Sequence, residues 1–255
     1  MIVLYDNTFE GLLSAVFEVY EHKLMTVQIR KEGVEQPSLF ESPIHVPTSE
    51  PKAKRVWNKL KMLIGEEGIS KLWKAWLTEE DDVEDCILGT IRYAIEQQLN
   101  VLSDFGNLHV LQLNQHLKKI NREKHRMEAF VRFQLTKDQL YYATVEPDFN
   151  VLPLIIKHFQ SRYADQCWLI FDLKRKYGIY YDLHTVEFVT IDIEGKSKPD
   201  FSNKELFQEN EAVYQLLWKD YFKSTNIKSR KNMKSHLQHV PRRYWKYLTE
   251  KGLDS

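Results

Sequence analysis

The spacing of apolar residues changes near residue 125, and this change constrains the fold more than any other feature of the sequence. Over residues 51–120, apolar side chains recur three or four positions apart, as they do on one face of a helix. Over residues 127–135 and 140–146 they alternate with polar ones, as in a half-buried strand. A chain that carries both periods in separate stretches is predicted to adopt an α+β fold.

Residues 1–124 are predicted to form a mainly helical part with a strand at its N-terminus. Residues 2–5 form this strand, and the apolar positions that follow recur at helical spacing behind Asp6 or Thr8, each of which can cap a helix. The stretch 35–51 contains four prolines and is predicted to be an extended loop.

Residues 125–255 are predicted to form the sheet-containing part. Two strands joined by the polar turn 136–139 come first, followed by a helix at 151–164 and three more strands. This order of strand, strand, helix and three strands predicts a mixed or antiparallel sheet with a helix on one face. An amphipathic helix at 203–222 and a basic segment at 223–249 complete the part, which could also be integrated with the first in one domain.

The net charge favours no class of partner, since 36 Lys and Arg residues balance 36 Asp and Glu residues. Attraction to nucleic acid therefore needs local clustering of charge. The two cysteines, Cys86 and Cys167, lie far apart and outside any CxxC, which is typical of a reducing compartment. No leader pattern and no apolar run of about 18 residues occurs, so we expect a cytoplasmic protein that does not enter the membrane.

Several common catalytic motifs do not occur in the sequence. It contains no GxxxxGK[ST], no GxGxxG after a strand, no HExxH and no GxSxG. The acidic run 79–85 is interpreted as the solvated start of a helix, where negative charge interacts favourably with the helix dipole. We therefore predict neither a cofactor nor a bound metal.

The basic segment 223–249 contains eight Lys or Arg, two His and no acidic residue. Tyr244, Trp245 and Tyr247 are interleaved with its last basic residues. Such a segment is either a solvated tail or a nucleic-acid surface on which cations meet phosphates. The aromatic side chains either stack on bases or anchor the segment to the protein, and we expect anchoring for at least two of the three.

The stretch 116–132 is a second basic cluster, in which Lys118, Arg122 and His125 fall on one stripe of a helix. Where the alternating pattern begins, a strand would place Arg132 on its polar face. A solvated stripe and a phosphate-binding one fit this pattern equally well. The candidate nucleic-acid-binding residues are Arg122, His125, Arg126, Arg132, Arg162, Arg230, Arg242, Arg243 and Trp245.

Glu146 and Asp148 follow a predicted strand and precede the helix that carries His158. The simpler interpretation is that Asp148 or Asn150 caps this helix. The alternative is a catalytic site at the sheet edge, with Glu146 or Asp148 as base or ligand and His158 beside them.

Four stretches together resemble a bacterial family of probable DNA metabolism proteins. They are "LYDNTFEGLLSAVFEVYE", "REKHRMEAFVRFQ", "ATVEPDFNVLPLIIKHFQSRYADQCWLIFDLKRKYGIYYD" and "RKNMKSHLQHVPRRYWKYLTE", and they span nearly the whole chain in the family's order. The matching positions are Asp6, Phe9, Glu10, His125, Arg126, Phe130, Arg132, Glu146, Pro147, Asp148, His158, Phe159, Arg162, Arg230, Asn232, Pro241, Tyr244 and Trp245. The family often has Asn-Pro near the end, whereas Met233 follows Asn232 here.

The resemblance implies a role in DNA repair or modification. Members of this family typically accompany a radical-SAM protein, and some are fused to a uracil-DNA-glycosylase-like domain. Because the chain lacks a CxxxCxxC, the resemblance implies a DNA-associated accessory partner and not the radical enzyme. Two alternatives stay open: a nuclease or base-processing enzyme that uses Glu146, Asp148 and His158, and a protein-interaction scaffold that does not contact DNA.

Overall fold

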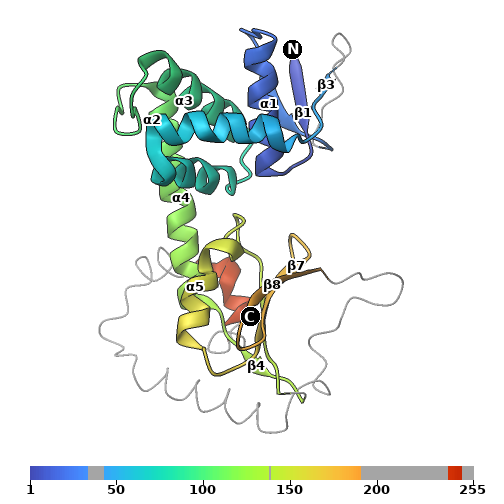
Figure 1. Cartoon of the computed structure of the whole chain (residues 1–255). Coiled ribbons are helices and arrows are strands. Elements are labelled where there is room, and N and C mark those ends of the chain that lie inside the picture. Colours follow the sequence, from blue (N-terminus) through green and yellow to red (C-terminus); the bar gives the residue numbers. More distant parts are fainter. Residues whose placement is uncertain (34–42, 138, 191–240, 249–255) are drawn as a thin grey trace. The chain divides into compact units, whose positions relative to one another are not determined.

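The computed structural model describes residues 1–33, 43–137, 139–190 and 241–248 of the 255-residue chain (Figure 1). The predicted helix at 203–222 and residues 223–240 of the basic segment lie outside the described residues. The chain divides into two compact units, Met1–Asn121 and Arg122–Ser255, and each is described by itself below. Helices and mixed strands confirm the predicted α+β fold. Within the described residues, no helix combines the length and the apolar character that crossing a bilayer requires.

The first unit contains a parallel three-stranded sheet with β1 in the middle. β1 is the predicted strand, and its residues Val3, Leu4 and Tyr5 are fully buried, as expected for a central parallel strand. The sequence does not indicate the two flanking strands, because segments of four and two residues are too short to show a period. The strands are β1 (Ile2–Tyr5), β2 (Gln28–Lys31) and β3 (Ile44–His45).

Helices make up most of the remaining first unit, as predicted. Thr8 caps the first of them, because its hydroxyl oxygen accepts a hydrogen bond from the Gly11 N–H at 2.9 Å. The second has Pro51 in its first turn and is kinked at Gly65, whose φ of 71° lies outside the helical region. The helices are α1 (Phe9–Glu21), α2 (Glu50–Trp76), α3 (Val83–Gln97) and α4 (Leu108–Phe130), and α4 continues into the second unit.

A buried polar network lies at the carboxyl end of β1. The Tyr5 hydroxyl donates to Glu84 Oε1 at 2.8 Å and accepts from Trp76 Nε1 at 2.9 Å. Lys31 Nζ lies 3.7 Å from the same carboxylate. Glu84 is only 3% exposed, and burial raises the pKa of its carboxyl group. The prediction that residues 79–85 form a solvated helix start is therefore wrong for Glu84, because its partners hold it inside.

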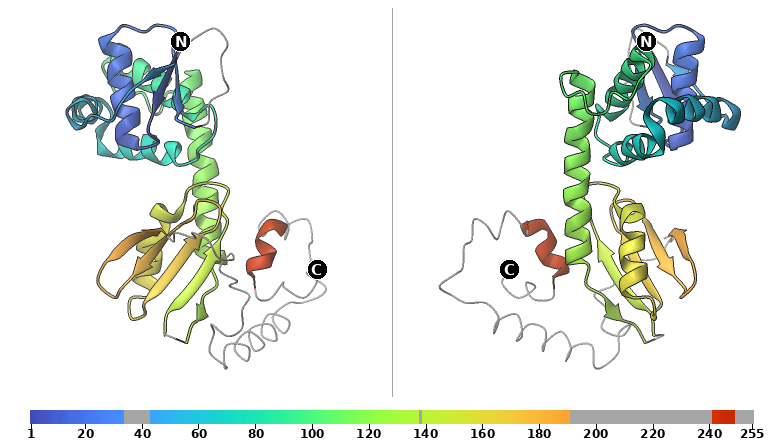
Figure 2. Two further views of the ribbon diagram at one scale, coloured as in Figure 1. Left: turned by 90° about the vertical axis from the view of Figure 1, so that its right-hand side faces the viewer. Right: turned by 60° about the vertical axis from the view of Figure 1, so that its left-hand side comes forward.

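The second unit has the predicted order of strand, strand, helix and three strands. Its sheet runs β4-β5-β6-β7-β8, with β5 and β6 parallel and the other neighbours antiparallel. The helix α5 covers one face of this sheet (Figure 2), where the Phe159 ring lies 6.1 Å from the Trp168 ring. The elements are β4 (Gln134–Leu135), β5 (Tyr141–Val145), α5 (Leu152–Arg162), β6 (Trp168–Asp172), β7 (Tyr177–Tyr181), β8 (Val186–Thr190) and the 3-10 turn η3 (Arg242–Tyr247).

The start of the alternating stretch is helical, so its interpretation as a strand is wrong. Helix α4 continues to Phe130, and the strand β4 contains only residues 134 and 135. Glu123, Met127 and Val131 are buried at intervals of four residues. The helical stripe therefore persists through a region in which apolar residues also alternate.

We expect Tyr5→Phe to lower the free energy of unfolding by about 1–3 kcal/mol, because Trp76 Nε1 and Glu84 would lose a buried hydrogen-bond partner. Urea unfolding followed by circular dichroism measures this change. The matched control is Tyr93→Phe, which removes an exposed hydrogen bond to Asp104 and should have little effect. Equal effects of the two substitutions would contradict a stabilising role for the buried network.

Candidate functional site

One buried carboxylate joins three segments of the second unit. Glu123 on α4 is 1% exposed, and its oxygens accept from donors on four described residues. Oε1 accepts from the Asp148 backbone N–H at 2.9 Å and from the Tyr244 hydroxyl. Oε2 lies 3.4 Å from Arg126 Nη1 and 3.3 Å from Arg243 Nη2. A carboxylate can lie inside a protein when its charge and lone pairs are satisfied in this way.

The turn η3 supplies two of these donors and is anchored by its aromatic side chains. Tyr244 is 2% exposed, and its ring lies 5.7 Å from the Phe130 ring of α4. Figure 2 shows η3 beside this end of α4. Burial raises the pKa of Tyr247, and so does its hydrogen bond to Glu146. The prediction that the aromatic residues anchor this segment is confirmed for Tyr244 and Tyr247.

The loop after β5 lies at the carboxyl end of the parallel pair β5 and β6, which is where ligand sites form in open α/β sheets. In this loop, Asp148 Oδ2 lies 2.5 Å from Arg243 Nη2. The Asp148 carbonyl accepts from Lys174 Nζ at 3.0 Å and from Arg175 Nη2 at 3.1 Å. The Arg175 guanidinium also pairs with the fully buried Asp172 at 2.9 Å. Cationic side chains from η3 and from the turn after β6 therefore surround the loop.

Sequence reasoning missed Lys174 and Arg175 as site residues. The sequence shows them in the basic turn 174–178, between two predicted strands. The turn reaches the loop after β5 because β5 and β6 are parallel neighbours and end at the same edge of the sheet. The basic residues of this turn are the feature of the sequence that could have indicated the site. The pairing of β5 with β6 was also needed, because it places the turn beside the loop after β5.

Three of the predicted nucleic-acid-binding residues take part in the internal structure. Arg126 and Arg243 pair with the buried Glu123. Arg132 follows the end of α4, and its Nη1 donates to the Ala129 carbonyl at 2.7 Å. The Arg243 guanidinium therefore links η3 to α4, whereas the described contacts of Arg126 and Arg132 lie within α4 or at its end.

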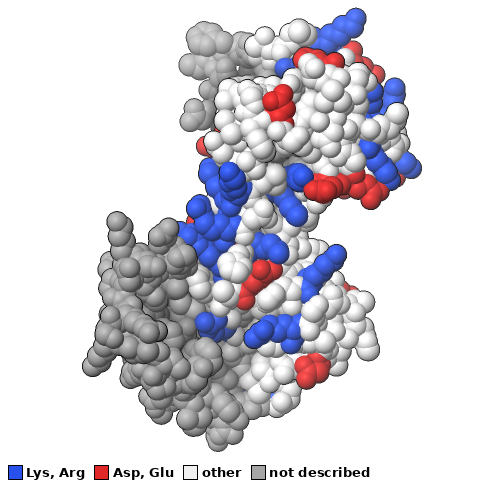
Figure 3. Space-filling model, turned by 90° about the vertical axis from the view of Figure 1, so that its left-hand side faces the viewer, with Lys and Arg blue, Asp and Glu red and all other residues white. Residues whose placement is uncertain are grey.

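Arg122, His125 and Arg162 are exposed on the second unit. In the described part of the chain, neither Arg122 nor Arg162 pairs with a carboxylate, and His125 lies 4.0 Å from Glu128 with its side chain 85% exposed. Figure 3 shows one face of the molecule, on which Lys and Arg side chains of this unit are more prominent than Asp and Glu. Binding of an anionic partner by these three side chains stays a prediction.

The remaining candidates are placed as follows. Trp245 is partly exposed, whereas Arg230 and the side chain of Arg242 lie outside the described residues. His158 lies about 9 Å along α5 from its first residue at 1.5 Å per residue, and its ring contacts Phe159. No described hydrogen bond or ion pair joins His158 to the carboxylates after β5.

Helix α5 does not begin as predicted. Its N-cap is Val151, which provides no side-chain hydrogen bond, so the prediction that Asp148 or Asn150 caps the helix is wrong. Asn150 Oδ1 instead accepts from the Tyr177 hydroxyl, and the Asp148 carboxylate pairs with Arg243. Tertiary partners have replaced the local capping bonds.

The region that contains these contacts also matches a known family. A family model for a domain of unknown function, DUF4130, covers residues 81–250. The chain belongs to this family. The DUF4130 domain includes α3, α4 and the described part of the second unit, with Glu123 and its partners. No curated protein matches the sequence.

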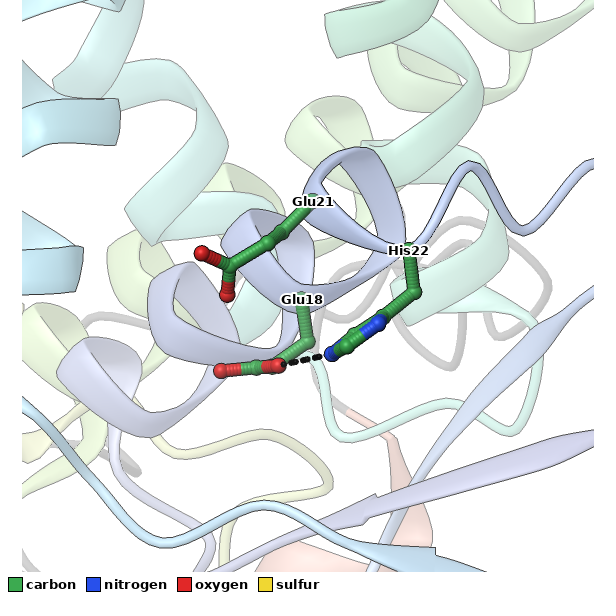
Figure 4. Close-up of side chains that lie close together, drawn as sticks. All are labelled: Glu18, Glu21 and His22. Atoms are coloured by element: carbon green, nitrogen blue, oxygen red, sulfur yellow. Dashed lines mark ion pairs between the residues drawn. The ribbon is translucent and has the colours of Figure 1, made fainter.

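Helix α1, outside the DUF4130 domain, carries a group that could hold a metal ion. Glu18, Glu21 and His22 place their ligand atoms within 4.8 Å of one another (Figure 4). However, Lys52 Nζ bonds Glu18 and lies 3.4 Å from Glu21, and His22 Nε2 lies 3.1 Å from Glu18. Because the Lys52 ammonium group already pairs with both carboxylates, the geometry favours a surface ion-pair cluster over a metal site.

A cavity of about 450 Å³ lies along one face of α3 in the first unit. Two of its charged groups have internal partners: Asp85 pairs with Arg30 at 2.7 Å, and Arg92 donates to the Leu24 carbonyl at 2.7 Å. Ligand sites typically offer a few polar groups that converge on the ligand. We therefore assign these two groups to the packing of α3 against β2 and the segment before it.

Cys86 is a buried residue of α3. Its thiol donates to the His109 carbonyl at 3.3 Å, and burial raises the pKa of the thiol to about 12. The nucleophilic form of cysteine is the thiolate, so this side chain is suited to packing and not to catalysis.

We expect Glu123→Gln to lower the free energy of unfolding by about 3 kcal/mol, because a neutral amide does not balance the charges of Arg126 and Arg243. Urea unfolding measures the loss. The matched control is Glu128→Gln on the same helix, which removes a pair with the partly exposed Lys124 and should have a much smaller effect. If the two variants lose the same free energy of unfolding, burial of the Glu123 carboxylate does not strengthen its ion pairs.

Proposed function

We propose that this chain is an accessory protein of DNA repair or modification whose second unit contacts DNA phosphates. The main support is that Arg122 and Arg162 are exposed and pair with no carboxylate in the described part of the chain. A guanidinium group without an internal anion can form charge-assisted hydrogen bonds with a phosphate.

The exposed cations lie on two helices of the second unit. Arg122 and His125 are three positions apart on α4 and so share a face. Lys157 and Arg162 are exposed on α5, which contains no acidic residue. In a chain whose formal charges sum to zero, such local concentrations are what attract a polyanion.

The proposal includes a protein partner. The resemblance to DNA metabolism proteins supports an association with a radical-SAM enzyme or a uracil-DNA-glycosylase-like protein. Since the sequence has no CxxxCxxC to hold an iron–sulfur cluster, the partner would carry the radical chemistry. The present chain would contribute affinity for DNA.

The two alternative functions stay predictions with less support. A catalytic role for Glu146, Asp148 and His158 requires the three groups to converge, whereas no described hydrogen bond or ion pair joins His158 to these carboxylates. A scaffold role would use the aromatic residues of η3, of which Tyr244 is buried in the chain itself. The described geometry therefore favours phosphate binding.

We expect Arg122→Ala and Arg162→Ala each to weaken the binding of duplex DNA by about three- to tenfold at low salt. Each should also flatten the dependence of log K on log salt by about 0.9, the contribution of one phosphate contact. The loss should be equal for unrelated sequences, because phosphates carry no sequence information. Fluorescence anisotropy of labelled duplexes, repeated at several salt concentrations, measures both quantities.

Lys54→Ala is the control for loss of one positive charge. Lys54 is exposed on α2 of the first unit, and we expect its substitution to change the affinity by less than about twofold. The proposal fails if the wild-type protein binds no DNA at low salt. It also fails if the two arginine variants behave like Lys54→Ala.

A further inference from the structure

Cationic side chains converge on Asp148 from two segments of the second unit. Arg243 Nη2 lies 2.5 Å from its carboxylate oxygen Oδ2. Lys174 Nζ and Arg175 Nη2 donate to its backbone carbonyl at 3.0 Å and 3.1 Å. An anion at this position therefore meets positive charge from both η3 and the turn after β6.

The backbone at Asp148 is held without help from its carboxylate. The backbone N–H donates to Glu123 at 2.9 Å, and Arg175 Nη1 donates to the neighbouring Pro147 carbonyl at 3.2 Å. The carboxylate has Arg243 as its partner in the described residues, and these two side chains are 45% and 42% exposed. The carboxylate can therefore turn into solvent while the loop keeps its place.

The Arg243 guanidinium is positioned independently of Asp148. It lies 3.3 Å from the buried Glu123 carboxylate and 4.6 Å from the centre of the Tyr244 ring. Because both contacts persist when Asp148 turns away, the guanidinium stays in place to receive another anion.

We propose that Arg243 and Lys174 form a phosphate-binding subsite whose place the Asp148 carboxylate takes in the free protein. A phosphodiester carries one negative charge and accepts hydrogen bonds from the same donors as a carboxylate. The phosphodiester then neutralises the Arg243 guanidinium in place of the carboxylate, which turns into solvent, and an exposed ion pair is weak enough to be displaced. The inference rests on the proposed function, because DNA supplies the phosphodiester.

The test is the substitution Asp148→Asn, which keeps the size of the side chain and removes its charge. We expect it to bind labelled duplex DNA about three- to tenfold more tightly than the wild type at low salt. The salt dependence of log K should steepen by about 0.9, because no displaced carboxylate then takes up a cation from solution when the phosphate binds. The matched control, Asp165→Asn, removes an exposed negative charge elsewhere in the second unit and should change the affinity less than about twofold.

Two further experiments test which residues form the subsite and which anion binds there. Adding Lys174→Gln to Asp148→Asn should cancel most of the gain, since Lys174 is an exposed cation of the subsite. Inorganic phosphate is titrated as the free anion. Phosphate that binds Asp148→Asn much more weakly than DNA supports a DNA strand as the occupant, whereas equally tight binding overturns this assignment.

The outcomes separate this inference from the proposed function. If the wild type binds DNA but Asp148→Asn binds no more tightly, the subsite is overturned and the proposed function stands. If neither the wild type nor any variant binds DNA, both are overturned. Asp148→Ser serves as a second removal of the charge, and urea unfolding of each variant shows that the proteins compared are folded.

Discussion

The buried carboxylate of Glu123 is the constraint on which the second unit depends. Moving a carboxylate out of water costs several kcal/mol, which only matched donors offset. Here the donors come from α4 itself, from the loop after β5 and from η3. The same contact therefore orders the end of a helix, the edge of a sheet and a turn about 120 residues further along the chain. Without it, the charges of Arg126 and Arg243 would lose their internal anion.

This arrangement also determines which cations can meet a partner. Carboxylates pair with Arg126, Arg175 and Arg243, whereas Arg122 and Arg162 are exposed on helices and form no ion pair in the described part of the chain. The net charge of zero does not show which charged side chains are paired and which are exposed, since it counts buried and exposed charges alike. A basic surface can therefore exist on a protein with no net charge.

The regular elements could be predicted because apolar periodicity is a local property of the sequence. The prediction from periodicity failed at Met127 and Val131, which fit a helix and an alternating strand equally well. Burial of both side chains in the folded protein favours the helix. The site could not be predicted, because Glu123 resembles any acidic residue on a helix. Its partner Tyr244 lies 121 residues away, and Lys174 appears in the sequence only as a residue of a turn. Such contacts between distant residues depend on the order of the strands and on where η3 packs, and no local sequence pattern indicates either.

A double-mutant cycle between Glu123→Gln and Tyr244→Phe tests the central role of this carboxylate most directly. The two side chains share a buried hydrogen bond, so their effects on the free energy of unfolding should not add. We expect an interaction energy of at least about 1 kcal/mol between the two substitutions in urea unfolding. Additive losses, within about 0.3 kcal/mol, would contradict the account, because they would show that η3 is ordered without Glu123.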